Sequence, residues 1–328
     1  MQQLKIGMIS FAHGHANSYL QALVSIPEVK VAGIADENRD RVAKQTEHHG
    51  IPYYADYREL LKTDIEAVVI CSENVHHLEH ITEAARAGKH VLCEKPLCLS
   101  VQEMEEAIRV CSENGVQLMT AFPCRYLPAV VRAKEAVDRG DIGEIVAIKG
   151  TNRGSMPGRW FIEPGLSGGG ALLDHTVHVM DLMNWFTGSR VTEVYAYAAT
   201  RFHEDLAVDD TGMISVKFEN GVFGVLDTSW SRPKAFPTWG DVTMEVIGTK
   251  GVLSIDGFAQ SNELYSDEIG KGVWAYWGDS MDHYMVKGFV EALLEETPVP
   301  ITGTDGLRST EVALAGYESV SRGQPVPL

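Results

Sequence analysis

Positive charge is scarce in this sequence, in which 28 lysines and arginines stand against 45 aspartates and glutamates, a formal net charge of −17. A nucleic acid or an anionic membrane surface would need a basic face, so this balance argues against both as main partners. Long apolar runs are lacking as well. Even the run at residues 67–71 is far shorter than the roughly 18 residues of a membrane-spanning helix, and we expect no transmembrane segment.

Cysteine is also rare, and its spacing does not suggest pairing. The five cysteines are Cys71, Cys93, Cys98, Cys111 and Cys124. Their number is odd, all lie in the first half of the chain, and no Cys-x-x-Cys pair occurs, which favours free thiols over a disulfide framework and disfavours a thiolate metal site. Residues 1–5 run into an apolar segment without the features of a signal peptide. We therefore expect a cytoplasmic protein.

The order of apolar segments favours an α/β chain with two domains. In the first part, buried strands alternate with helices, and we expect strands at 4–9, 29–35, 66–70, 91–93 and 117–121. In the second part the period is two residues, and we expect strands at 145–151, 191–198, 211–218, 222–230, 242–247 and 252–255, with a hairpin turn at Asn220-Gly221. The fold predicted is an N-terminal Rossmann domain over residues 1–123, with a doubly wound parallel sheet, and a C-terminal α/β domain over 124–328 with a large open, mostly antiparallel sheet.

A complete glycine fingerprint for a dinucleotide is missing from the first strand–turn–helix. Such a turn usually reads Gly-x-Gly-x-x-Gly, whereas here Ser10, Ala12 and His15 hold the three glycine positions and Gly14 comes one place early. Ser10 and Ala12 are small enough to let a pyrophosphate approach the helix N-terminus. His13 and His15 could cover that group or reach a substrate, and exposed loop histidines are an equally good interpretation.

Glu94, Lys95 and Pro96 follow the apolar run 91–93 directly, so a lysine stands at the carboxyl end of a predicted strand. Ligands bind at that edge of an open α/β sheet, which makes Lys95 a candidate for chemistry. Preceded by Gly-Lys-His-Val, the Glu-Lys-Pro sequence resembles the signature of the glucose-fructose oxidoreductase/inositol dehydrogenase/MocA family of nicotinamide-dependent oxidoreductases. The resemblance extends over nearly the whole chain.

A second motif begins with glycines at 168–170 and continues into a predicted helix that carries Asp174 and His178. Four residues apart on a helix, a carboxylate and an imidazole face the same way and suit a proton-transfer pair. A metal site of Asp174, His175, His178 and Asp181 is the weaker alternative, since one helix rarely supplies a whole coordination shell and Lys95 would be unexplained. Gly-Gly-Gly-x-x-x-Asp-x-x-x-His is similar to the family's second signature, and we expect no metal.

The resemblance implies roles for individual residues. His178 would take the hydroxyl proton, Asp174 would orient His178, and Lys95 would bind the reacting oxygen. Cofactor contacts are expected from Ser10, Ala12, His13, Gly14, His15, Asp36, Cys71, Ser72, Asn74, His77, Glu94, Lys95 and Pro96, with His76 as an alternative to His77. Substrate contacts are expected from Arg125, Arg153, Arg159, Trp160 and His175.

NAD is the cofactor expected, with NADP possible. Asp36 ends the second strand, where a carboxylate can bind ribose hydroxyls, and Glu37 adds a charge that repels a 2′-phosphate. Arg39 is the residue that could partly neutralise such a phosphate.

The resemblance further implies hydride transfer between nicotinamide and a secondary alcohol or ketone of a sugar, polyol or inositol. Redox-assisted elimination or glycoside cleavage with internally recycled NAD stays open, as does a dinucleotide-sensing regulator without catalysis. A small carbohydrate or polyol is the expected partner. Because the open sheet needs cover on its second face, we also expect a homodimer or homotetramer.

Overall fold

The computed structural model describes residues 3–277 and 280–328, and the chain divides into two compact units. The first unit comprises Met1–Pro123 and Asp282–Leu307, and the second comprises Cys124–Met281 and Arg308–Leu328. The sequence-based division assigned everything after residue 123 to the second domain. It differs from the structure for Asp282–Leu307, which pack with the first unit.

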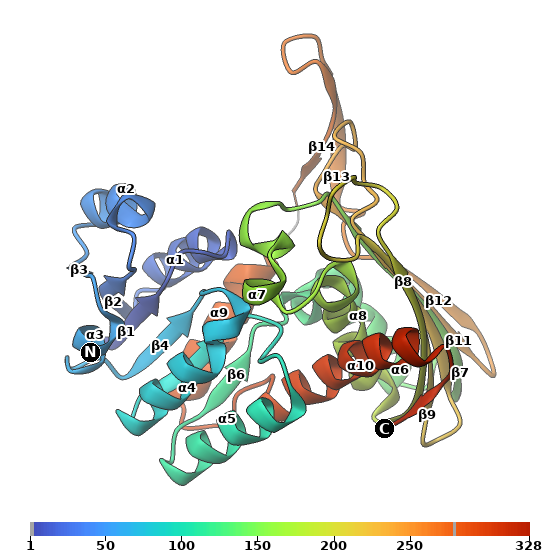
Figure 1. Cartoon of the computed structure of the whole chain (residues 1–328), viewed down its shortest axis with the longest axis horizontal. Coiled ribbons are helices and arrows are strands. Elements are labelled where there is room, and N and C mark those ends of the chain that lie inside the picture. The colour runs from blue at the N-terminus through green and yellow to red at the C-terminus, as the bar shows by residue number, and fades with distance from the viewer. Residues whose placement is uncertain (1–2, 278–279) are drawn as a thin grey trace. The chain divides into compact units, whose positions relative to one another are not determined.

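The first unit is built on a six-stranded parallel sheet with strand order β3-β2-β1-β4-β5-β6 (Figure 1). Its strands are β1 (Leu4–Ile9), β2 (Val29–Ala35), β3 (Tyr53–Tyr54), β4 (Ala67–Ile70), β5 (His90–Cys93) and β6 (Leu118–Thr120). Its helices are α1 (His15–Ser25), α2 (Arg39–His49), α3 (Tyr57–Leu61), α4 (His77–Arg86), α5 (Val101–Glu113) and α9 (Met281–Leu294), with a 3₁₀ turn at Asn74–His76. β4 is buried at every position, as in a parallel sheet covered on both faces. The predicted Rossmann fold is confirmed.

Local signals in the sequence place two of these helices. The Asn38 side chain caps α2 by accepting the Asp40 N–H. Ser100 Oγ accepts the Glu103 N–H at the start of α5, and Glu103 in turn accepts the Leu99 N–H. Side-chain oxygens thus take up backbone N–H groups that have no partner within the helix.

The edge of the sheet at β6 is covered by a segment from the far end of the chain. Thr120 N–H donates to the Ile301 carbonyl over 3.1 Å, and Met119 forms an isolated antiparallel bridge with Thr302. The Gln117 side chain accepts the Val299 N–H at 2.7 Å. Because these bonds occupy backbone groups of an edge strand, residues 299–302 belong to the first unit.

The second unit is built on a seven-stranded sheet with strand order β12-β11-β7-β10-β9-β8-β15. The strands are β7 (Ile145–Gly154), β8 (Val191–Ala199), β9 (Thr211–Phe218), β10 (Phe223–Ser229), β11 (Gly240–Gly248), β12 (Val252–Asp256) and β15 (Val326–Pro327). The helices are α6 (Pro128–Asp138), α7 (Pro164–Ser167) and α8 (Ala171–Thr187), with 3₁₀ turns at Pro123–Tyr126 and Arg159–Ile162. Only the β7–β10 pair is parallel, which confirms the mostly antiparallel sheet. α10 (Gly303–Arg322) contains the division between the units, after Leu307.

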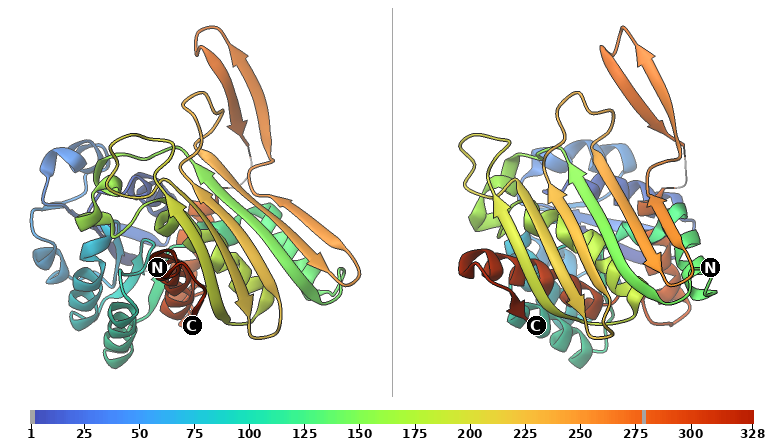
Figure 2. Two further views of the ribbon diagram at one scale, coloured as in Figure 1. Left: turned by 45° about the vertical axis from the view of Figure 1, so that its right-hand side comes forward. Right: turned by 90° about the vertical axis from the view of Figure 1, so that its right-hand side faces the viewer.

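Asn220 and Gly221 form the predicted hairpin turn between β9 and β10, with Gly221 at φ +87°. A second hairpin, β13 (Ser261–Ser266) and β14 (Lys271–Tyr276), forms a separate two-stranded sheet that projects from the unit (Figure 2). This hairpin was not among the strands expected from the sequence. None of the helices within the described residues is both long and apolar enough to span a bilayer.

The two faces of the seven-stranded sheet differ. α8 packs closely on one face, since a Cβ on Gly150 of β7 would lie only 2.5 Å from Val179 of α8. Figure 2 shows no helix of the second unit over the opposite face. Large apolar side chains are exposed there, among them Tyr197, Met213, Phe223 and Val225.

Candidate functional site

A cleft of about 270 Å³ lies at the carboxyl ends of the parallel strands in the first unit. It is lined by residues that follow β1, β2 and β4, including Ser10, Asp36, Ser72 and Glu73. Strand order reverses between β1 and β4, and α/β sheets bind their ligands at such a point. The cleft thus lies where a sheet of this kind binds its ligands, and Ser10, Asp36 and Ser72, which were predicted to bind the cofactor, line it.

Asp36 organises the loop that replaces the glycine fingerprint. Its two carboxylate oxygens accept the N–H groups of Phe11, at 2.7 Å, and Asn38, at 2.8 Å. Ser10 adopts a left-handed backbone at φ +66°, a conformation usually left to glycine, and its Oγ accepts the Ala12 N–H. The loop therefore keeps its turn without glycine because side chains hold its backbone in place.

His13, His15 and Glu94 meet beside this loop. His15 Nδ1 lies 2.9 Å and His13 Nδ1 lies 3.6 Å from the same Glu94 oxygen, which is buried. Burial lowers the pKa of His15, but the charge and hydrogen bond of Glu94 outweigh it and leave the pKa raised. Burial likewise opposes ionisation of Glu94, yet the two histidines hold its pKa well below the usual range. A carboxylate–imidazolium pair thus ties α1 to the end of β5.

The same three residues are the one set in the described part of the chain whose ligand atoms lie close enough, within 4.8 Å, to hold a metal ion. The spacing of these three residues in the sequence did not suggest such a set. His13 Nδ1 already accepts the His15 N–H at the start of α1, and His15 is paired with Glu94. These contacts give the residues a function in shaping the loop, and the expectation of no metal stays a prediction.

His77 joins two of the predicted cofactor loops. Its Nδ1 contacts the Pro96 carbonyl at 2.8 Å and its Nε2 contacts the Ser72 carbonyl at 3.3 Å. The ring is fully buried, and burial lowers its pKa. The nearby Asn74 is buried too, and the Cys71 carbonyl accepts the His13 N–H. Cys71 thus contacts His13 through its backbone carbonyl. Burial raises the pKa of its thiol well above the usual range, so the thiol stays protonated.

Two residues that line the cleft were missed in the sequence, Tyr57 and His80. His80 Nδ1 lies 3.1 Å from Ser72 Oγ, and burial lowers the pKa of His80 to about 3. The Tyr57 ring meets the His80 ring edge-on with centroids 4.5 Å apart. A neutral imidazole and a phenol thus form one wall of the cleft. Their only sequence signal is helical spacing from Ser72 and the position of Tyr57 after β3.

The arginine that lies beside Asp36 is Arg41, and Arg39, which the sequence suggested for this position, lies elsewhere. Arg41 Nη1 lies 3.6 Å from the Asp36 carboxylate and 3.9 Å from that of Glu73. Arg39 instead lies over the Tyr53 ring at 5.7 Å from its centroid. Both residues are in the first turn of α2, and the helical rotation of about 100° per residue decides which one faces the strand ends.

Lys95 is buried, with 4% of its surface exposed, and its N–H donates to Glu94 Oε2 at 3.1 Å. The predicted reactive lysine is therefore held on a loop that the Glu94 and His77 contacts fix from two sides.

In the second unit, two of the three glycines of the motif, Gly169 and Gly170, stand in crowded positions at the start of α8. A Cβ on Gly170 would lie 1.9 Å from the Asp209 carbonyl oxygen. The Asp209 carboxylate caps α8 by accepting the N–H groups of Gly170 and Leu172, and it also accepts the Tyr317 hydroxyl. Burial raises the pKa of Asp209. Nothing in the sequence near residue 170 indicated this partner.

Asp174 and His178 both lie on α8, as predicted. Asp174 Oδ2 accepts the Trp230 indole N–H at 3.2 Å and pairs with His175 Nε2 at 3.4 Å. His175 Nδ1 lies 2.9 Å from the Asn152 carbonyl, so both of its nitrogens face oxygen acceptors. His178 is buried, with its Nδ1 3.9 Å from Cys124 Sγ.

Arg125 forms a two-pronged salt bridge with Asp181, with distances of 2.7 Å and 2.5 Å. Both side chains are nearly buried. The pair ties the start of the unit to α8, and it engages the carboxylate that the alternative metal site would have needed. The predicted substrate contact of Arg125 stays a prediction beside this structural pair.

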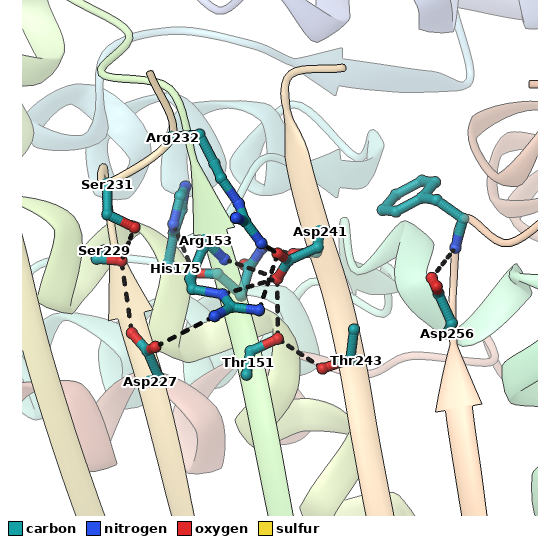
Figure 3. Close-up of polar contacts among 12 residues, drawn as sticks. Thr151, Arg153, His175, Asp227, Ser229, Ser231, Arg232, Asp241, Thr243 and Asp256 are labelled. Carbon is teal, nitrogen blue, oxygen red and sulfur yellow. Dashed lines mark hydrogen bonds and ion pairs between the residues drawn. The ribbon is translucent and has the colours of Figure 1, made fainter. Parts of the chain in front are cut away.

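Arg153 lies on the opposite face of the sheet from His175 (Figure 3). Its neighbour in β7, Gly154, faces the His175 ring, and successive strand residues point to opposite faces. Arg153 pairs with Asp241 at 3.2 Å and Asp227 at 3.9 Å, and Arg232 also pairs with Asp241. Arg153 and His175 therefore lie on different faces of the sheet, and substrate contact by either residue stays a prediction.

The remaining predicted substrate residues lie in the turn Arg159–Ile162. Arg159 is exposed and has φ +54°. Trp160 is buried and stacks on Phe161 with ring centroids 3.9 Å apart. Trp160 thus contributes to packing, whereas the Arg159 side chain is exposed and accessible to solvent or a ligand.

Comparisons with known proteins agree for both units. Residues 4–122 match the oxidoreductase family described as an NAD-binding Rossmann fold, and residues 130–254 match the GFO/IDH/MocA C-terminal domain. The chain is similar to the uncharacterized oxidoreductase YrbE of Bacillus subtilis, at 32% identity over 94% of this chain and 92% of that protein. It is also similar to the myo-inositol 2-dehydrogenase of Thermotoga maritima, at 28% identity over 99% and 98%.

The chain is also similar to solved structures. GenD2 from gentamicin A biosynthesis, in complex with NAD, has a TM-score of 0.93 and 25% identity over 100% of this chain and 97% of its own. The scyllo-inositol dehydrogenase of Lactobacillus casei, with NAD(H) and scyllo-inositol bound, has a TM-score of 0.87 and 25% identity over 99% of each chain.

Proposed function

The chain belongs to the GFO/IDH/MocA family of NAD-binding oxidoreductases, and we propose from this premise that it transfers a hydride between nicotinamide and a secondary alcohol or ketone of an inositol, another polyol or a sugar. Relatives named for their substrates support this class, since they act on myo-inositol and scyllo-inositol. NAD is the preferred cofactor in this proposal, because Asp36 stands at the end of β2 with Glu37 beside it.

The observation that carries the proposal is the position of Asp174 and His178 on one buried helix. Bonds from Trp230 and His175 fix the Asp174 carboxylate. Asp174 and His178 are four residues apart on α8 and so face the same side of the helix, and in this proposal the carboxylate orients the His178 ring. These contacts suit a general base more than a surface ion pair.

In the oxidation direction, the bound nicotinamide ring supplies the acceptor for the hydride. His178 takes the hydroxyl proton on Nε2, since its Nδ1 faces Cys124. Asp174 stabilises the imidazolium that results. Lys95 donates a hydrogen bond to the substrate oxygen and stabilises the negative charge that develops there. In the reductive direction the proton returns from His178 to the same oxygen.

The test is steady-state turnover with NAD and a panel of inositols, other polyols and sugars. We expect His178→Ala and Lys95→Met each to lower turnover by about two to four orders of magnitude, the range for losing a positioned acid–base group. NAD binding should persist in both variants, and His48→Ala, on the surface of α2, is the matched control. Near wild-type turnover of His178→Ala would exclude the histidine from the reaction.

The relatives named by activity are dehydrogenases and reductases, which gives no support to elimination, glycoside cleavage or a purely regulatory function. The same substrate panel separates these alternatives. Net accumulation of NADH with a polyol supports the dehydrogenase, whereas product without net NADH indicates a recycled cofactor.

We also propose that the chain assembles into a homodimer or homotetramer through the face of the second unit's sheet that no described helix covers. Tyr197 and Met213 are 67% and 59% exposed on that face, more than isolated surface positions explain. Light scattering at micromolar concentration tests this, and a mass near 36 kDa contradicts it.

A further inference from the structure

Trp239 is an exposed aromatic residue beside the candidate acid–base residues of the second unit. The residue is 46% exposed, and its indole ring contacts the His175 ring with centroids 6.4 Å apart. His175 Nε2 in turn lies 3.4 Å from Asp174 Oδ2. His175 thus links the indole to the carboxylate that takes part in the proposed reaction. A single exposed apolar side chain is ordinary on a protein surface, but this one is also held in place from two sides.

The backbone of Trp239 is fixed at the end of the seven-stranded sheet. Its carbonyl accepts the Ser155 N–H at 2.7 Å, and the next residue, Gly240, pairs with Gly154 in the register of β7 and β11. A Cβ on Gly154 would lie 2.8 Å from His175 Cε1 and 3.4 Å from Trp239 Cε3. Glycine at position 154 therefore lets the imidazole and the indole both lie against the end of β7, on the face of the sheet that α8 covers.

The indole ring itself is held by two other rings. His175 meets it at an interplanar angle of 71°, and Phe258 meets it at 81° with centroids 5.6 Å apart. Phe258 is in turn in edge-on contact with Tyr276, the last residue of β14. Neither ring stacks flat on the indole, so these contacts fix its orientation and still leave almost half of the residue exposed. A ligand that binds there meets a surface that is already ordered.

The surroundings of the indole suit a neutral ring with hydroxyl groups at its rim. The negative face of an indole attracts the slightly positive hydrogens of C–H groups, and covering it removes apolar surface from water. Inositols and pyranoses with mainly equatorial hydroxyls present such C–H groups together on one flat face. An open-chain polyol has no permanent face of this kind, because it rotates about its C–C bonds and loses that freedom on binding.

We propose that Trp239 is a stacking platform through which the second unit selects ring-shaped substrates, inositols and pyranoses, over open-chain polyols. This inference rests on the proposed function, because Asp174 and His178 define the site that the indole adjoins. The C–H face of the ring covers the indole, and the hydroxyls at the rim remain available to polar side chains. Trp239 takes no part in proton or hydride transfer, so it acts on substrate affinity and specificity.

The experiment compares rings with open chains in one binding measurement. We would determine dissociation constants by calorimetry with the protein saturated with NADH, so that a bound polyol cannot be oxidised. The ligands are scyllo-inositol and methyl β-D-glucopyranoside as rings, and D-sorbitol and xylitol as open chains. The values of kcat and KM with NAD are measured for each ligand that is oxidised.

The proteins are the wild type, Trp239→Ala, Trp239→Leu, Trp239→Phe and the control Tyr265→Ala. Leucine keeps apolar volume without a flat ring, and phenylalanine keeps a smaller ring. Tyr265 is 77% exposed on the hairpin β13–β14, where its hydroxyl donates to Glu263 of the same strand. Its substitution removes an exposed aromatic side chain from the same unit without touching the indole.

We expect Trp239→Ala and Trp239→Leu each to weaken both rings at least about tenfold, the effect of a lost stacking contact, and both open chains less than about twofold. Trp239→Phe should stay within about threefold of the wild type for the rings, and Tyr265→Ala within about twofold for all four ligands. For a ring that is oxidised, KM should rise with the dissociation constant while kcat changes less than about threefold.

An equal loss for rings and open chains in Trp239→Ala overturns the inference, as does ring binding by Trp239→Leu that equals the wild type. A lower kcat with unchanged ring affinity also overturns it, since the indole would then act through His175. If Trp239→Ala does not fold, Trp239→Leu and Trp239→Phe decide the comparison. A wild type that oxidises open chains with NAD but binds neither ring refutes the platform and leaves the proposed function standing. A wild type that neither binds nor oxidises any inositol, polyol or sugar of the panel refutes both.

Discussion

The N-terminus of α1 in the first unit and the N-terminus of α8 in the second find acceptors for their backbone N–H groups in different ways. Each helix has N–H groups in its first turn that need acceptors. At α1, where glycines are usual, Ser10 and Asp36 hold the turn and the His13 ring accepts the His15 N–H. At α8 the glycines are kept, and the acceptor is Asp209, some forty residues further along the chain.

The difference shows what a glycine is for at each place. Around Gly14 nothing lies within 4 Å of the position a Cβ would take, whereas at Gly170 the Asp209 backbone occupies it. The α1 loop therefore tolerates side chains and leaves room for a ligand. The start of α8 is closely packed, and Gly170 allows the helix that carries Asp174 and His178 to lie directly against the backbone of Asp209.

The largest effect is expected from filling the crowded region. Gly170→Ala would place a methyl group 1.9 Å from the Asp209 carbonyl oxygen, and a backbone atom cannot move away as a flexible side chain would. We expect a loss of at least about 3 kcal/mol in the free energy of unfolding, measured by urea denaturation. A loss below about 1 kcal/mol would mean that the close approach is not what requires glycine there.

A smaller effect is expected from Glu94→Gln in the first region. The lowered pKa of Glu94 means that its carboxylate stabilises the fold above the unfolded value of 4.5 and loses this effect as pH falls through the folded value. The raised pKa of His15 means that its protonated ring stabilises the fold below the unfolded value of 6.5. This contribution is lost as pH rises through the folded value. The deficit of the variant should thus be largest between pH 4.5 and 6.5, at about 2 kcal/mol, in urea titrations across pH.

Asp209→Asn provides the contrast from the second region. Burial raises the pKa of Asp209, so its contribution to stability is fully present below the unfolded value of 3.8 and is lost as pH rises through the folded value. On acidification below pH 4.5 the deficit of Glu94→Gln should shrink while that of Asp209→Asn grows. Parallel pH profiles of the two variants would show that neither carboxylate has the environment described.

The smallest effect is expected from Gly14→Ala. Gly14 has φ −61° and ψ −28°, which any residue adopts, and its Cβ position is open. We expect the free energy of unfolding to change by less than about 0.5 kcal/mol. Alanine could raise it slightly, because it lowers the conformational entropy of the unfolded chain. Dissociation constants for NAD measured beside the unfolding curves add information, since weaker binding at unchanged stability would place the cofactor against this position.

The fold could be predicted because its signals are local. Apolar runs marked β1, β2 and β4, Asn38 and Ser100 marked helix starts, and Asn220-Gly221 marked a hairpin. Contacts between distant segments left no such mark. The pairing of residues 299–302 with β6 is one such contact. The hairpin β13–β14 was not expected either, because its residues show no clear alternation of apolar and polar side chains that would mark them as strands.

The residues of the candidate site were easier to select from the sequence than their contacts were. Lys95, Asp174 and His178 stand out in sequence because motifs fix their spacing. The residues that contact the candidate site from distant parts of the chain do not stand out. Trp230 bonds to Asp174, Asp209 caps the helix that carries it, and Arg41 lies beside Asp36, and only the tertiary structure shows these contacts. Strand alternation alone would have assigned Arg153 and Gly154 to opposite faces of the sheet, had β7 been expected to extend to Gly154.

The pairing of residues 299–302 with β6 has a consequence for how the chain is made. Residues 1–123 leave the ribosome long before their last partner segment, and until that segment arrives β6 presents an unpaired strand edge. Folding of the first unit must wait for the synthesis of everything between, and such non-local closure is slow. A fragment that ends at residue 123 should therefore aggregate during expression, and adding residues 282–307 through a linker should rescue it.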